Sequence, residues 1–130
     1  MLSGEAVAID VQPIGFVLRA AGAIIDLGVV IGENVIVASG ATIVHGAVVE
    51  DGVTIAGGAV VSARARVGTM ALVGLGAVLK NDVTIGARSL IGTGSLVVRD
   101  LPEWVVAYGS PAKAMRQVRP EDFELRRSEK

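Results

Sequence analysis

The sequence has 130 residues, and its 12 Lys and Arg against 13 Asp and Glu give a formal net charge of −1. Because a phosphate-binding face needs clustered cations, this balance argues against a nucleic-acid-binding protein. The chain has no cysteine and is 3% aromatic with 17 glycines, so we expect no disulfide or thiolate chemistry and one domain with a narrow aliphatic core.

Residues 1–24 follow no regular pattern, and we expect them to cap the regular structure that follows. The apolar run from Ile14 to Leu18 could add an irregular strand that covers an open sheet edge. The apolar stretch extends to Ile31 but is broken by Arg19 and Asp26, and the first residues lack a basic region. We therefore expect neither a signal peptide nor a membrane span, and a cytoplasmic location.

A six-residue period dominates the middle of the chain. Every sixth position is Ile, Val or Leu: Ile25, Ile31, Val37, Ile43, Val49, Ile55, Val61, Val67, Val73, Leu79, Ile85, Ile91 and Val97. Two positions before each residue from Ile31 onward stands a small residue: Val29, Val35, Ala41, Ala47, Val53, Ala59, Ala65, Ala71, Ala77, Val83, Ser89 and Ser95. Alternation within each unit indicates a short strand, and recurring glycines indicate a turn. Such repeats must stack on one another, which predicts an all-β parallel β-helix over residues 25–102.

Three hexapeptides make one coil, so residues eighteen apart stack in one column. His45, the only histidine, then shares a column with Leu27, Ala63, Asn81 and Arg99 at a corner outside the core. An imidazole at such a corner could act as a general base that takes a proton from a hydroxyl or amine. The alternative is a solvated turn residue or a subunit contact.

The repeat ends near Pro102, and residues 103–130 form a C-terminal loop and helix. Pro120, followed by Glu121 and Asp122, predicts the start of a short helix. The stretch from Val97 to Arg116, VVRDLPEWVVAYGSPAKAMR, resembles the end of bacterial hexapeptide acyltransferases, in which a Val-rich coil runs into a strand, a Gly-x-Pro-Ala-Lys turn and a short helix. This resemblance implies a left-handed β-helix, a homotrimer and acetyl-CoA, or another acyl-CoA, in grooves between subunits.

The spacing around His45 is most similar to that in the acetyltransferases of sialic acid and of nucleotide-linked amino sugars. The resemblance implies that His45 is the general base, that the Ala63 N–H stabilises the oxyanion, and that the acceptor is an amine or hydroxyl of a sugar or nucleotide sugar. These families usually carry an N-terminal nucleotide-binding-type domain, for which this sequence has no room. Two positions differ: an acidic residue often follows the histidine, where Gly46 stands, and a second histidine is common where Thr54 stands. Glu50 and Asp51 are nearby candidates for orienting the imidazole, but the favoured interpretation of both is a surface charge on a turn.

The acyl-CoA groove is predicted at a second corner. The column of Ser39, Gly57, Leu75 and Thr93 could face the His45 column of a neighbouring subunit, where small residues and backbone amides suit the pantetheine arm. Asn81 in the His45 column is a further cofactor contact, and Arg99, Lys113 and Arg116 are the nearest cations for the phosphates. Arg64 and Arg66 interrupt the glycine pattern and could bridge subunits. Trp104 and Tyr108 are expected to cover the end of the prism.

Two other functions compete with acyl transfer. A zinc carbonic anhydrase on this fold needs three histidine ligands, whereas each chain has one histidine, so we expect no metal. A catalytically inactive trimeric scaffold or CoA-binding protein is the stronger rival, and Gly46 and Thr54 favour it. The same scaffold can carry different chemistries, so the fold alone does not decide between them.

Overall fold

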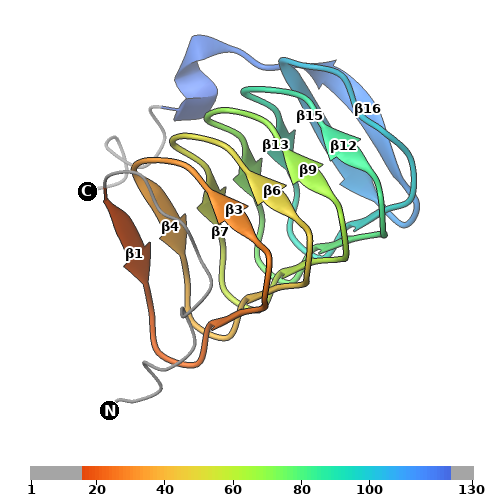
Figure 1. The fold of residues 1–130 in the computed structure, drawn as a ribbon. Helices are drawn as coiled ribbons and strands as arrows, with labels where there is room; N and C mark the ends of the chain where they lie inside the picture. The colour runs from red at the N-terminus through yellow and green to blue at the C-terminus, as the bar shows by residue number, and fades with distance from the viewer. Residues whose placement is uncertain (1–15, 124–130) are drawn as a thin grey trace.

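The protein is a parallel β-helix in the computed structural model, which describes residues 16–123 (Figure 1). Its strands form three sheets around a triangular prism. Sheet A contains β1 (Val17–Arg19), β4 (Val35–Val37), β7 (Thr54–Ile55), β10 (Leu72–Val73), β13 (Leu90–Ile91), β15 (Val105–Gly109) and β16 (Ala112–Gln117). Sheet B contains β2 (Ile24–Ile25), β5 (Thr42–Ile43), β8 (Val60–Val61), β11 (Val78–Leu79) and β14 (Leu96–Val97). Sheet C contains β3 (Val30–Ile31), β6 (Val48–Val49), β9 (Arg66–Val67) and β12 (Thr84–Ile85).

Each strand pairs in parallel with the strand one coil away, and the partners are eighteen residues apart. Thr54 on β7, for example, pairs with Ile36 on one side and Leu72 on the other. This register confirms the eighteen-residue columns. The ladder begins at β1, where Arg19 pairs with Val37, so it reaches into the segment predicted to be a cap. Residues 1–15 of that segment lie outside the described residues.

The core is the predicted double column of large and small side chains. Every aliphatic residue at the six-residue positions from Ile25 to Val97 is at most 3% exposed, and the smaller residues from Val29 to Ser95 are at most 4% exposed. Short two-residue strands leave room for only one large inward side chain each, which explains why aliphatic residues fill the prism and aromatic rings are absent from it.

Three corners join the sheets. The His45 corner, between sheets B and C, comprises the turns 26–29, 44–47, 62–65, 80–83 and 98–100. The acidic corner, between sheets C and A, comprises 32–34, 50–53, 68–71, 86–89 and 102–104, and the small-residue corner, between sheets A and B, comprises 20–23, 38–41, 56–59, 74–77 and 92–95. Many turns have a left-handed glycine, but Arg64, Met70, Asp82 and Arg88 adopt the same conformation with φ of 61 to 68°. A glycine pattern therefore marks these turns without being required at all of them.

Two glycines give a test of what the corners tolerate. A Cβ at Gly68 would lie 2.7 Å from the backbone N of Ala87 and 2.9 Å from the carbonyl O of Ile85, whereas a Cβ at Gly58 would meet nothing within 4 Å but would need φ near +69°. We expect Gly58→Ala to cost about 1–2 kcal/mol of unfolding free energy through backbone strain. Gly68→Ala should cost more than that, because overpacking against backbone costs about 1–3 kcal/mol or more. Denaturant unfolding of the two variants measures both, and a larger loss for Gly58→Ala would contradict the packing argument.

The C-terminal end is closed by a hairpin. β15 continues sheet A next to β13, and β16 pairs antiparallel with β15 through a turn at Ser110 and Pro111. Two buried serines fasten this return: Ser89 Oγ donates to the Pro102 carbonyl at 2.7 Å and accepts from the Val105 N–H at 3.1 Å, and Ser95 Oγ accepts from the Gly109 N–H at 3.2 Å.

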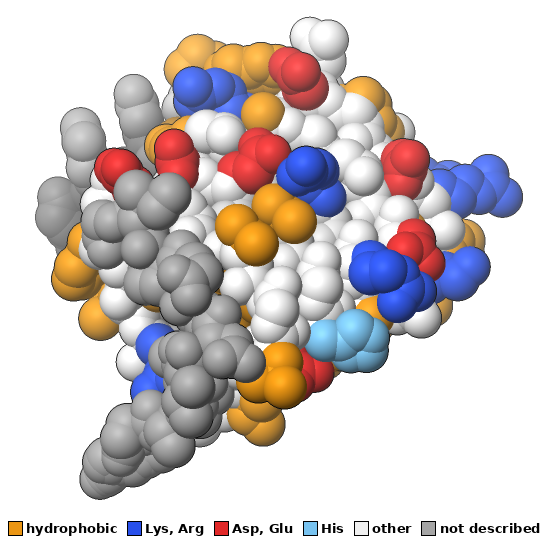
Figure 2. All heavy atoms as spheres, in the orientation of Figure 1, with side chains coloured by type: hydrophobic (Ala, Val, Ile, Leu, Met, Phe, Trp, Pro, Cys, Tyr) orange, Lys and Arg blue, Asp and Glu red, His pale blue; other side chains and the backbone are white. Residues whose placement is uncertain are grey.

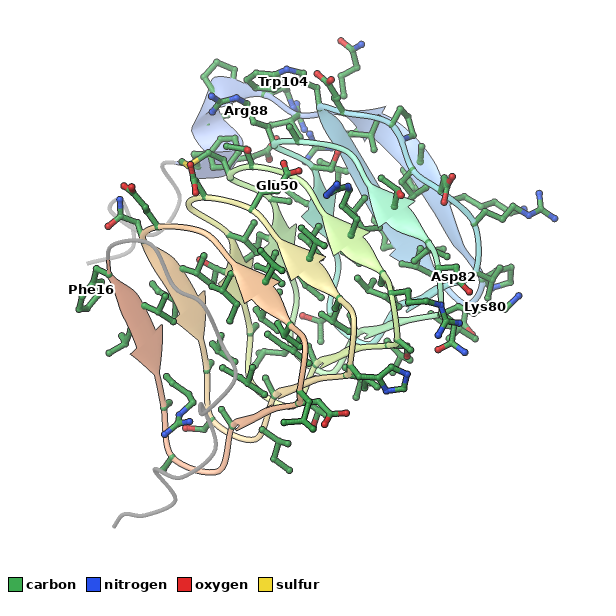
Figure 3. All side chains as sticks on the ribbon, in the orientation of Figure 1. Phe16, Glu50, Lys80, Asp82, Arg88 and Trp104 are labelled. Carbon is green, nitrogen blue, oxygen red and sulfur yellow. The ribbon has the colours of Figure 1, made fainter. Side chains whose placement is uncertain are left out.

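Two expectations about this end need correction. The resemblance implied that the Gly-x-Pro-Ala-Lys turn leads into a short helix, but Ala112 and Lys113 begin β16. Helical residues begin at Pro120, as predicted from Pro120, Glu121 and Asp122, and are described to Phe123. Trp104 was expected to cover the prism, but it is 45% exposed and stacks with Arg88 at the acidic corner, 5.3 Å from the guanidinium carbon to the ring centroid (Figure 3). Tyr108 is likewise half exposed. A rigid main-chain hairpin can close a ladder edge without aromatic side chains, because β16 pairs with the groups of β15 that would otherwise stay open.

Candidate functional site

His45 lies in the turn between β5 and β6, where the chain leaves sheet B for sheet C. Its side chain is 60% exposed, and Figure 2 shows the single histidine on the surface at one edge of the visible face, beside basic and acidic side chains. Gly46 follows it with φ of 75°, a left-handed conformation that turns the chain at once into the next strand. The imidazole is therefore held at its base by the fold and is open to solvent at its tip.

A carboxylate from the preceding coil lies against the base of His45. Asp26 accepts hydrogen bonds from the Leu27 N–H at 2.8 Å and from the His45 N–H at 3.2 Å. Its Oδ2 lies 3.6 Å from His45 Nδ1, and the Asp26 side chain is 46% exposed. Sequence reasoning missed this residue. The signal was present, because Asp26 precedes Val44 by eighteen residues and so adjoins the His45 column.

The two carboxylates proposed from the sequence as neighbours of His45 lie elsewhere. Glu50 accepts hydrogen bonds from the Thr69 N–H at 3.1 Å and the Thr69 hydroxyl at 3.2 Å, and Asp51 accepts from the Glu33 N–H at 2.8 Å. Both belong to the acidic corner. Neither residue orients the imidazole, and the alternative, a charge on a turn elsewhere on the surface, holds for both. Five or six residues along the chain lead past strand β6 to the next corner, whereas neighbours in adjacent coils are about eighteen residues apart.

The backbone N–H of Ala63 lies one coil beyond His45. Ala63 is 6% exposed, and its N–H donates to no residue within the described range 16–123. At two turns the N–H in the same position is capped by a carboxylate nineteen residues earlier, because Asp26 caps His45 and Glu50 caps Thr69. Val44 stands at that place before Ala63 and has no acceptor atom. A free donor thus remains one coil beyond His45 at the same corner.

An ion pair continues the His45 corner on the far side of Ala63. Arg64 Nε and Nη2 donate to the two carboxylate oxygens of Asp82 at 2.7 and 3.0 Å. The hydrogen bond from Arg64 holds the pKa of the Asp82 carboxyl below its usual value, and the same bond raises the pKa of Arg64. Arg66 likewise lies 3.6 Å from Glu50 within the chain. Both arginines, expected to bridge subunits, make ion pairs inside one chain.

The remaining predicted residues fall into three places. Asn81 and Arg99 are exposed at the His45 corner. Figure 3 labels Lys80 and Asp82 at the same corner. Leu75 and Thr93 are exposed at the small-residue corner, away from His45 in the same chain. Lys113 is exposed on β16 at the C-terminal end. One chain therefore does not bring all the predicted cofactor contacts together.

The small-residue corner is lined by uncharged turns. Its four turns from 38–41 to 92–95 consist of Ala, Gly, Ser and Thr, with Leu75 as the one large side chain. The N–H groups of Gly57, Leu75 and Thr93 donate to no residue of the described part of the chain. The corner therefore offers a smooth apolar edge with a row of open amide donors.

Arg116 is engaged within the C-terminal segment. Its guanidinium donates to both carboxylate oxygens of Asp122 at 2.9 and 3.0 Å, and with the Arg119 N–H it lowers the pKa of Asp122 to about 2. This pair fastens the first helical turn to β16. Arg99 and Lys113 have no ion-pair partner in residues 16–123, so of the three cations considered for phosphates they are the available ones.

Comparison with known proteins identifies the scaffold. Residues 28–63 match the family described as bacterial transferase hexapeptide (six repeats). The structure is similar to the acetyltransferase domain of PglB from Neisseria gonorrhoeae FA1090, with a TM-score of 0.73 and 28% identity over 82% of this chain and 55% of that one. The same domain is also known in complex with acetyl coenzyme A. The chain has the left-handed β-helix fold of hexapeptide-repeat proteins.

Two further structures resemble this hexapeptide-repeat protein. GDP-perosamine N-acetyl transferase from Caulobacter crescentus, solved as a histidine-to-alanine mutant in complex with CoA and GDP-perosamine, has a TM-score of 0.73 and 30% identity over 85% of this chain and 55% of that one. A hexapeptide transferase family protein from Anaplasma phagocytophilum, with a TM-score of 0.68 and 24% identity over 94% of this chain and 81% of that one, supports the fold alone. The chain spans 55% of the length of the PglB domain and of the perosamine enzyme. No curated protein sequence matched.

Within residues 16–123, no group of three or more His, Asp or Glu side chains could hold a metal ion. Over the same range, no helix has the length and hydropathy to cross a membrane.

Proposed function

We propose that the protein transfers an acetyl group from acetyl-CoA to an amino or hydroxyl group of a sugar-like acceptor. The observation that carries this proposal is the pairing of an exposed imidazole, His45, with the open backbone donor of Ala63 one coil on. A base and an oxyanion donor on one corner are what acyl transfer from a thioester needs. The similar structures that contain acetyl coenzyme A, or CoA with GDP-perosamine, support the same class of reaction.

The chemistry follows from these two groups. His45 takes the proton of the acceptor N–H or O–H as the acceptor atom attacks the thioester carbonyl carbon. The carbonyl oxygen becomes an oxyanion and accepts the hydrogen bond of the Ala63 N–H, which stabilises the tetrahedral intermediate. The carbon–sulfur bond then breaks, and the proton held by His45 passes to the departing CoA thiolate. The products are the acetylated acceptor and free CoA, and no metal takes part.

The cofactor groove needs a second subunit in this proposal. Leu75 and Thr93 lie at the small-residue corner, and a homotrimer would set that corner against the His45 corner of a neighbour, with the open amides along the pantetheine arm. Asn81 would contact the cofactor from the His45 side, and Arg99 and Lys113 would hold phosphates because their charges are free. We assign the reaction to the cytoplasm, where acetyl-CoA is available.

The experiment that tests the proposal is calorimetric titration of CoA and acetyl-CoA into the purified protein, with the mass of the same sample measured by light scattering. We expect saturable binding near one site per chain in a trimer. A monomer at micromolar concentration would contradict the shared groove. No binding at millimolar ligand would contradict the acyltransferase assignment altogether.

The second candidate is a trimeric scaffold or CoA-binding protein without turnover. Gly46 and Thr54 favour it, because they replace an acidic residue and a histidine common in the similar families. Thr54 lies half-buried on β7 in sheet A, a different face from the His45 corner. Specific CoA binding with no transfer to any amine, alcohol or sugar acceptor would favour this candidate over the enzyme.

A further inference from the structure

The Asp26 carboxylate is preorganised beside His45 by the backbone. Its Oδ1 accepts from the Leu27 N–H at 2.8 Å and its Oδ2 from the His45 N–H at 3.2 Å, so both oxygens are held in place from the preceding coil. The Oδ2 that faces the imidazole is 3.6 Å from Nδ1. We propose that Asp26 is the positioning residue that holds His45 in the tautomer with a proton on Nδ1. This inference rests on the proposed function, in which His45 is the base.

The distance between His45 Nδ1 and Asp26 Oδ2 must shorten before the two atoms form a hydrogen bond. At 3.6 Å the two atoms do not form a hydrogen bond, and they attract as opposite charges only when the imidazole is protonated. The carboxylate has unused lone pairs, since each oxygen accepts only one backbone donor. A small rotation about the His45 side-chain bonds, which are free at an exposed corner, brings Nδ1–H onto Oδ2. Catalytic hydrogen bonds are often this long before substrate binds.

The turn disfavours the more direct arrangement without excluding it, since Arg64 and Asp82 take the same place in their turns with positive φ. A carboxylate directly after the histidine would have to stand at residue 46, where φ is 75° and a Cβ would lie 3.1 Å from Cγ of Arg64. Gly46 therefore admits the Arg64 stem, whose guanidinium is already taken by Asp82. The position one coil back is open, and Asp26 occupies it. The carboxylate that orients the imidazole comes from across the ladder instead of along the chain.

The position of Asp26 determines which nitrogen of the His45 imidazole can accept a proton. With Nδ1–H directed at Asp26, the lone pair of Nε2 points away from the protein and can accept the proton of the acceptor. The negative charge of Asp26 also stabilises the imidazolium that forms during transfer, as the buried aspartate does in a Ser-His-Asp triad. Because both side chains are about half exposed, solvent screens part of this effect. Asp26 acts through His45 and does not touch the acceptor.

The tautomer can be read directly, because the chain has a single histidine. Two-dimensional 1H–15N spectra of the imidazole in alkaline buffer give one pattern, which distinguishes a proton on Nδ1 from a proton on Nε2. We expect the Nδ1–H form to dominate in the parent protein, and Asp26→Asn to shift the population towards Nε2–H, the usual major form of a free imidazole. Asp51→Asn is the matched control, because Asp51 is also an exposed carboxylate that accepts a backbone N–H, but at the acidic corner. A parent protein that already shows Nε2–H, or an Asp26→Asn spectrum equal to the parent spectrum, overturns the proposal.

Rate measurements on Asp26 variants, with and without His45, distinguish a role of Asp26 in positioning the imidazole from the acetyl-transfer activity itself. Asp26→Asn should lower kcat for acetyl transfer about tenfold with KM for acetyl-CoA unchanged, a part of the roughly 10²–10⁴-fold that a general base contributes. Asp26→Glu should recover part of the loss, and Asp26→Asn should add nothing in a His45→Ala background. An equal loss in that background would make Asp26 a structural residue only. If no variant has measurable activity and the parent has none, the proposed function fails, while the tautomer result still decides the role of Asp26.

Discussion

Replacing His45 with alanine should lower acetyl transfer at least about a hundredfold, because loss of a general base normally removes about 10²–10⁴-fold of the rate. The side chain is 60% exposed and its only side-chain neighbour within 4 Å of opposite charge in residues 16–123 is Asp26, so its removal leaves no cavity in the core. The loss should therefore appear in kcat and not in stability. Steady-state assays of CoA release, with the acceptor that gives the highest parent rate, measure it.

The control is the state of the variant protein. Light scattering and thermal unfolding should match those of the parent, and acetyl-CoA should bind with unchanged affinity, since the cofactor contacts proposed here lie on other residues. Turnover equal to that of the parent would remove His45 from the mechanism. Loss of the assembled state in the variant would make His45 a subunit contact, the alternative that the sequence left open.

A carboxylate placed at residue 44 should block the oxyanion site. Asp26 shows that a side chain at this position of a turn accepts the N–H nineteen residues later, and Val44 leaves the Ala63 N–H open. We expect Val44→Asp to cap that N–H and to lower kcat about a hundredfold, the cost of losing one oxyanion donor. Rate measurements at saturating acetyl-CoA test this, because the effect should lie in the transition state and leave cofactor binding unchanged.

Two companion variants separate the cap from other effects of the substitution. Val44→Asn carries an acceptor without the charge and should also lower kcat, whereas Val44→Ala carries none and should retain most of the parent rate. If Val44→Ala loses as much as Val44→Asp, the loss comes from packing at the half-buried Val44 and not from the donor. A full rate in both Val44→Asp and Val44→Asn would exclude the Ala63 N–H from the reaction.

The position of Asp26 bears on the choice between an active enzyme and an inactive scaffold. Gly46 removes the acidic residue that usually follows the histidine, which favoured an inactive protein when only the sequence was considered. Asp26 supplies a carboxylate at the same imidazole from another coil. The absence of an acidic residue at position 46 therefore does not by itself indicate loss of activity.

Much of the fold followed from the sequence, because a period of six is a physical constraint on every coil. Ile55 and Leu79 could be assigned to the core without any structure, since each strand contributes one large inward side chain. The same period determined that His45, Ala63 and Asn81 share a corner, because stacking converts a separation of eighteen residues into contact between coils. A repeat makes long-range neighbours predictable from counting alone, and that is why this part of the site was found.

Only the tertiary structure decided where side chains and aperiodic segments go. Glu50 is five residues from His45 in the sequence and Asp26 is nineteen, yet of these two it is Asp26 that lies against the imidazole, because backbone donors hold its carboxylate there. The return of β16 along β15 lies beyond the repeat, where no period specifies the path and the hydrogen bonds of Ser89 and Ser95 do so instead. The six-residue period of the sequence determines which residues stack in one column, because strands eighteen residues apart pair in the sheets. Contacts within and beyond a column depend on side-chain directions and main-chain hydrogen bonds, which appear only once the coils are stacked.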